Sequence, residues 1–260
     1  ISRLFNNLDT NIKIDINKVF IDKNDFLKSL KSNIKFTKNN IEKLDLSGNF
    51  ADNKKLTLTI RTNKNNVKIT TLYSEHAKPL VKKYKFIKGF EEGSLDFYST
   101  KENNISKSKL KINNFKLQEV PALTKILTLA SLQGIADLLS GEGIRFNEFE
   151  MSFTNLDNLM TINEIYAIGP AISILVEGYI EKKKLISLRG TLVPATTVNK
   201  TIAKIPLIGE LLVGKKTGEG VFGVSFKIKG PPKNLKTTVN PIKTLTPRFI
   251  TRTLEKLKKN

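Results

Sequence analysis

Few residues in this chain have the type and spacing that catalysis or cofactor binding requires. Residues 209–216, GELLVGKK, come near the phosphate-binding loop GxxxxGK[S/T], whose backbone amides surround a phosphate and whose hydroxyl binds Mg²⁺. Lys216 occupies the hydroxyl position, and Pro206 leaves no room for the buried strand that precedes such a loop. Residues 218–223, GEGVFG, have dinucleotide-loop spacing but lead into a strand pattern rather than a helix. We interpret the first segment as a helix end that runs into a lysine- and glycine-rich turn, and the second as a hairpin turn.

The remaining candidate groups are isolated along the sequence. His76 is the only histidine and there is no cysteine, which excludes a histidine metal cluster, cysteine metal ligands, disulfides and thiol nucleophiles. The carboxylates with polar neighbours are scattered over turns and alternate strand faces: Glu142, Glu148, Glu150 and Glu164. No pair of them has a spacing that favours general acid–base catalysis. We therefore predict a protein that is not an enzyme, with no catalytic residue, no metal and no cofactor.

Composition limits the possible partners. The formal net charge of +20 permits a polyanion partner, but lysine far outnumbers arginine, and basic and aromatic residues do not cluster as they do in nucleic-acid-binding surfaces. We expect no nucleic acid. No secretory signal or long apolar helical run is visible. Because the chain begins at Ile1 and enters a strand pattern almost at once, we expect it to be the C-terminal part of a longer protein.

The elements that must form any site are mostly strands, because apolar residues alternate with polar ones far more often than they follow helical spacing. At least nine short antiparallel strands are expected, joined by polar turns. Their apolar faces are the candidate lining of a lipid groove: Ile12, Ile14, Ile16, Leu56, Leu58, Ile60, Ile172, Ile174, Val176, Val224, Phe226 and Ile228. Alternation alone does not separate a lining residue from one in a covered core.

Three segments break the strand pattern. Residues 25–31 are compatible with a short helix or an apolar patch in a loop. Residues 121–140 predict one substantial helix, with Pro121 in its first turn and Gly141 after its end. It either packs on the sheet as core or covers the end of an apolar groove. The tail from residue 247 predicts a basic amphipathic helix that lies on an anionic membrane or is simply solvated. Its candidate membrane contacts are Arg248, Phe249, Arg252 and Lys256.

Several segments between residues 89 and 250 together resemble the C-terminal region of AsmA-like proteins, most closely the YhdP branch, which is related to TamB. They are 93–97 GSLDF, 114–122 NFKLQEVPA, 130–134 ASLQG, 143–146 GIRF, 169–170 GP, 190–195 GTLVPA, Asn199, 205–212 IPLIGELL, 218–220 GEG, 230–231 GP and 239–241 VNP. The most specific block runs from 193 to 209. Residues 1–88 resemble the family only in strand rhythm, and residues 232–234 lack the more acidic turn that is common there.

The resemblance implies a bridge-like phospholipid transporter of the Gram-negative envelope. Such a protein is anchored in the inner membrane by an upstream segment, lies in the periplasm and meets the outer membrane at its distal end. The expected fold is mainly β, an elongated antiparallel sheet curled into an open apolar groove, with one substantial helix at about 121–140 and a short C-terminal helix. Residues 1–88 would form a β-rich groove segment continuous with the AsmA-like region at 89–260.

Two alternatives to phospholipid transport stay open at this point. The first is a structural or chaperone-like periplasmic module that assists outer-membrane assembly by offering sheet edges. The second is a polyanion-binding protein, which the net charge permits.

Overall fold

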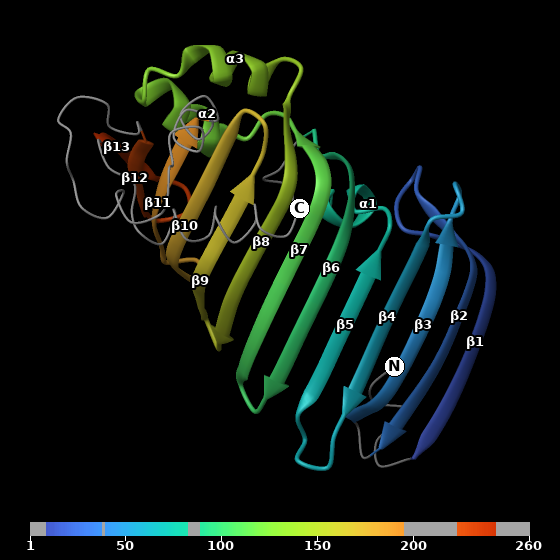
Figure 1. Cartoon of the computed structure of the whole chain (residues 1–260). Coiled ribbons are helices and arrows are strands. Elements are labelled where there is room, and N and C mark those ends of the chain that lie inside the picture. The colour runs from blue at the N-terminus through green and yellow to red at the C-terminus, as the bar shows by residue number, and fades with distance from the viewer. Residues whose placement is uncertain (1–8, 38–39, 83–88, 195–222, 243–260) are drawn as a thin grey trace, which may run out of the picture.

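The described part of the chain folds into one open antiparallel sheet of thirteen strands in the order of the sequence, β1 to β13 (Figure 1). It was obtained as a computed structural model, and the structure describes residues 9–37, 40–82, 89–194 and 223–242. The expectation of a mainly β antiparallel fold is confirmed. Each strand pairs with its neighbours in sequence, so β1 and β13 are the two edges of the sheet. The pairing of β5 with β6 makes the sheet continuous across the boundary expected near residue 88.

The strands are longer than the sequence suggested, from 7 to 13 residues. They are β1 (Thr10–Phe20), β2 (Phe26–Thr37), β3 (Asn40–Phe50), β4 (Lys55–Thr62), β5 (Lys68–Ser74), β6 (Glu91–Glu102), β7 (Ile105–Leu117), β8 (Ile144–Leu156), β9 (Leu159–Ile168), β10 (Ile172–Glu181), β11 (Leu185–Pro194), β12 (Gly223–Gly230) and β13 (Lys236–Ile242). The described helices are α1 (Lys78–Val81), α2 (Pro121–Leu129) and α3 (Gln133–Ser140).

The two ends of the strands differ in their connections. At one end, the lower end in Figure 1, tight turns join the strands, and residues such as Asn103 and Asp157 adopt positive φ. Asn and Asp tolerate this left-handed conformation better than other residues with a Cβ. At the opposite end lie α1, α2 and α3. We call these the hairpin end and the helix end of the sheet.

Residues 25–31 form neither of the expected structures, because they begin strand β2. Ser29 has a φ of 50°, and the register between β2 and β3 shifts between Lys28 and Lys31. This bulge turns Leu27 to the same side of the sheet as Leu30, although the two are three residues apart. A spacing of three resembles a helical face, which explains the error.

The helix expected over 121–140 is two helices, because α2 ends at a tight cap. Ser131 has a φ of 59°, the amide of Leu132 donates to the Leu127 carbonyl at 2.9 Å, and the amide of Ser131 donates to Thr128 at 3.0 Å. These two bonds form the Schellman motif that closes many helices. Glycine normally occupies the left-handed position of this motif, so a serine there gives no sequence signal.

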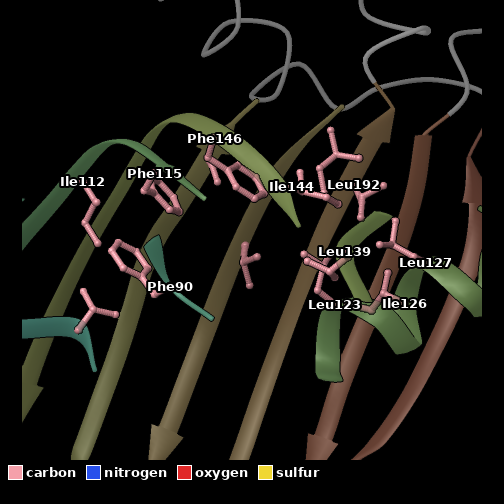
Figure 2. Close-up of a cluster of buried hydrophobic side chains, with 14 of the residues drawn as sticks. Phe90, Ile112, Phe115, Leu123, Ile126, Leu127, Leu139, Ile144, Phe146 and Leu192 are labelled. Atoms are coloured by element: carbon pink, nitrogen blue, oxygen red, sulfur yellow. The ribbon is translucent and has the colours of Figure 1, made fainter. Parts of the chain in front are cut away.

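The largest hydrophobic cluster lies on one side of the sheet and is concentrated at the helix end. Side chains from α2 and α3, including Leu123, Ile126 and Leu139, gather beside Ile144 and Leu192 of the sheet (Figure 2). A second part of the core contains three phenylalanine rings; Phe90 stacks on Phe115 and Phe115 on Phe146, each with 5.4 Å between ring centroids. A smaller cluster lies beneath the helix end of the first strands and consists of Leu27, Phe50 and Leu56.

Two other expectations concern residues outside the described part of the chain. These are the C-terminal helix, with Arg248, Phe249, Arg252 and Lys256, and the segment 209–222, which contains most of both loop-like motifs.

Candidate functional site

The candidate site is the apolar face of the sheet, which the strand register defines. Residues paired across antiparallel strands point to the same side, so a face can be followed from strand to strand. Starting at Ile14, the pairs form one row that crosses all thirteen strands, which we call the central row. It consists of Ile14, Ser32, Leu46, Leu58, Leu72, Phe97, Leu110, Met151, Ile165, Val176, Gly190, Phe226 and Val239. No charged residue interrupts it.

Two further rows of the same face flank the central row. The helix-side row includes Leu56, Ser74, Leu95, Ile112, Phe149, Ala167, Ile174, Leu192 and Val224. The hairpin-side row consists of Ile12, Ile34, Leu44, Ile60, Thr70, Ser99, Ser108, Phe153, Ile162, Gly178, Leu188, Ile228 and Thr237. The apolar band is therefore about three residues deep over most of the sheet.

The structure places all twelve lipid-groove candidates on this one face, but only half of them are accessible. Six are buried and belong to the covered core: Leu56, Ile172, Val176, Val224, Phe226 and Ile228. The other six, Ile12, Ile14, Ile16, Leu58, Ile60 and Ile174, keep part of their surface exposed. The extent to which the apolar face is covered varies along the sheet. Helices α1, α2 and α3 pack over the helix end. The central row from β1 to β9 is only half-buried, apart from Ser32, which is buried.

The sheet also covers part of its own face near β11. Gly190 lies in the central row opposite Phe226, and a Cβ on Gly190 would meet the Phe226 Cζ atom and the Leu175 carbonyl oxygen, each at 2.5 Å. The absence of a side chain at Gly190 lets the Phe226 ring lie close to the backbone of β11. Phe226 is therefore only 5% exposed.

The apolar band narrows sharply at β5, β6 and β7. On the helix side, Leu95 and Ile112 are buried in the hydrophobic cluster that includes Val81 of α1 and Ala77, the residue before α1. On the hairpin side, the row consists of the hydroxyl residues Thr70, Ser99 and Ser108 on these three strands. Among the residues of the three rows on these strands, only Leu72, Phe97 and Leu110 are both apolar and partly exposed. We call these three residues the strip.

Sequence reasoning did not select the residues of the strip. The alternation of apolar and polar residues includes Leu95 and Phe97 on β6 and Leu110 and Ile112 on β7. Alternation within one strand does not show how neighbouring strands pair. Only this pairing shows that the strip joins the wider apolar areas on either side of β5 to β7.

The opposite face of the sheet is mostly polar and carries ion pairs across neighbouring strands, although Tyr166 and Val193 are buried on it. Lys109 Nζ lies 3.6 Å from Glu150 Oε2, and Lys111 Nζ lies 3.3 Å from Glu148 Oε1. Arg189 Nε donates to Glu177 Oε1 at 2.7 Å. Glu148 and Glu150, which were considered as acid–base candidates, are thus paired with lysines on β7.

His76 lies at the helix end, beside an open polar depression of about 700 Å³ that Lys54, Lys78 and Glu91 help to line. Its ring contacts Phe50 edge-on at 5.2 Å between centroids, and its Nδ1 atom is 4.0 Å from Asp52 Oδ2. Burial lowers the pKa of His76 below its ordinary value, and Lys54 acts in the same direction against the opposing effect of Asp52. The contact with Phe50 and the lowered pKa are consistent with a structural role of His76.

Among the described ranges, no group of three or more His, Cys, Asp or Glu side chains could hold a metal ion. Within the same ranges, no helix is long and apolar enough to cross a membrane.

Comparison of the chain with protein-family models, with curated proteins and with solved structures found no match.

Proposed function

We propose that the protein binds the acyl chains of phospholipids along the central row and conducts them across the sheet. The observation that supports this function is an apolar row that crosses thirteen strands without a charged residue and stays partly exposed over most of its length. A groove of this kind holds a chain without polar recognition, since each buried methylene contributes about 0.8 kcal/mol. From β1 to β9 the central row is half-buried apart from Ser32, and its neighbouring sites offer apolar contacts of the same kind, so a lipid moves from strand to strand there without a large barrier.

The setting that we propose is the periplasm of a Gram-negative bacterium, with an inner-membrane anchor upstream and the outer membrane at the distal end. The resemblance to AsmA-like proteins supports this setting. The direction of the rows supports it as well, because they run perpendicular to the strands and thus along the long dimension of the sheet (Figure 1).

A pair of adjacent aromatic residues provides a matched test. Phe97 lies on the apolar face, whereas Tyr98 lies on the polar face and is 45% exposed. A photoreactive phenylalanine analogue is placed at one position or the other, and the protein is illuminated with vesicles of phosphatidylethanolamine and phosphatidylglycerol. We expect lipid adducts by mass spectrometry from position 97 and none from position 98.

Leu58 and Thr59 on β4 provide a second pair with the same relation, since Leu58 is in the central row and Thr59 pairs with Thr71 on the other face. Equal labelling of the two faces at both strands, or no adduct at all, would contradict the proposal.

The chaperone-like alternative has one supporting observation: within the described part of the chain, β1 and β13 each pair with a strand on one side only. An unpaired edge can accept another strand. Under this alternative, a peptide that adds to an edge would bind without competition from lipid, and the adducts at position 97 would be absent.

A further inference from the structure

From the helix-side row to the hairpin end, the charge on the apolar face of β4 to β12 is confined to one place. Of the residues that the register assigns to this part of the face, Lys68 and Lys101 are the ones with charged side chains. They are direct partners on β5 and β6, at the hairpin end. Lys101 is exposed and Lys68 partly so, and neither forms an ion pair within the described part of the chain.

A layer of hydroxyl groups separates these lysines from the strip. Thr70 and Ser99 are direct partners one row above the lysines, and Ser99 pairs in turn with Ser108. The hydroxyl oxygens of Ser99 and Ser108 are 2.8 Å apart, and Ser108 is only 8% exposed. On the flanking strands the same row is apolar, with Ile60 on β4 and Phe153 on β8.

Three layers of different polarity therefore follow one another up β5 and β6. Lys68 and Lys101 come first, then Thr70 and Ser99, then the strip. Successive layers are two residues apart along a strand, which is about 6.6 Å. A phospholipid has the same order of groups on a similar scale, from a charged phosphate through polar glycerol esters to apolar chains.

We propose that Lys68 and Lys101 bind the phosphate of an anionic phospholipid whose acyl chains lie on the strip and the adjoining central row. This inference rests on the proposed function and adds a headgroup preference to it. Two like charges in direct register repel each other, and an anion between them removes that repulsion. Lysine ammonium groups form charge-assisted hydrogen bonds to phosphate oxygens, while the hydroxyls of Thr70 and Ser99 lie where the ester oxygens would be.

The test compares two lysolipids with equal chains, lysophosphatidylglycerol with a net negative headgroup and lysophosphatidylcholine with a neutral one. Binding is measured below their micelle concentrations. We expect the wild-type protein to bind the anionic lipid about tenfold more tightly, as two partly exposed charge-assisted contacts allow. The preference falls with added salt because these contacts are screened.

The K68Q/K101Q variant should lose the preference and keep its affinity for lysophosphatidylcholine. Lys229 and Lys236 provide the control, because they too are direct partners but on the polar face, and K229Q/K236Q removes the same charge. This control should keep the preference, as should K68R/K101R, which retains the charges and shows that β5 and β6 tolerate substitution.

The outcomes separate the two proposals. If the wild-type protein binds neither lysolipid, the proposed function fails. If it binds both equally, or if K68Q/K101Q keeps the preference, the headgroup site is wrong and the function stands. Glycerol 3-phosphate, which has no acyl chain, should not compete at concentrations where the lysolipid saturates. Equal competition would assign the lysines to free phosphate and overturn the lipid site.

Discussion

Replacing Phe97 by aspartate tests whether the strip is the passage between the two halves of the apolar face. Phe97 is the middle residue of the strip, and on β6 it has no apolar and exposed neighbour on either side, because Leu95 is buried and Ser99 is polar. A chain that crosses this strand therefore rests on Phe97 alone. The substitution places a carboxylate there and removes the apolar contact.

The magnitude follows from the strand spacing. Adjacent strands are about 4.8 Å apart, which corresponds to roughly four methylenes of an extended chain crossing β6. At about 0.8 kcal/mol for each fully buried methylene these would contribute about 3 kcal/mol. Since the face is open on one side, we expect about half of that, ~1.5 kcal/mol, or an affinity about tenfold lower.

The assay is displacement of an environment-sensitive fluorescent lysolipid at equilibrium. Tyr98→Asp is the control, because it introduces the same charge one residue away on the polar face, and Phe97→Leu should retain most of the affinity. Urea unfolding of all variants shows that the sheet is intact. If Phe97→Asp binds as well as the wild-type protein, or if Tyr98→Asp loses as much affinity, chains do not cross β6 at the strip.

Two further predictions concern the stability of the sheet. Gly190→Ala should lower the free energy of unfolding by about 1–3 kcal/mol, as overpacking does, because the new Cβ would meet both the Phe226 ring and a carbonyl oxygen of β10. In urea unfolding, adding Phe226→Leu should relieve only part of this loss, since the backbone contact remains, and a full recovery would contradict the close approach of β10 and β11. The single histidine gives a direct pH test: the NMR titration midpoint of His76 should lie below about 6.5, because burial disfavours its charged form. The unfolded state then binds the proton more tightly, so stability is complete above that pH and falls as the pH drops through the folded pKa, a slope that His76→Asn should reduce.

The strands were largely predictable because alternation is a local property of the chain. The pattern Ile12, Ile14, Ile16 on β1 and Val224, Phe226, Ile228 on β12 is visible from the residues alone, and so is the polarity of the opposite face. Errors arose where the backbone departs from regular geometry. The bulge at Ser29 made a strand resemble a helix, and the left-handed Ser131 divided α2 from α3 without the glycine that usually signals such a cap.

The sequence by itself determined that this protein is a sheet with one apolar face and one mostly polar face, because side-chain direction in a strand follows from residue parity. Tertiary structure decided which apolar residues are accessible, because coverage depends on helices and strands that are distant in sequence. Leu56 and Leu58 have the same parity and similar chemistry, yet Leu56 is buried at the helix end while Leu58 lies in the open central row. Register likewise brought Lys68 beside Lys101 and joined Leu72, Phe97 and Leu110 into one strip, relations that no local pattern contains.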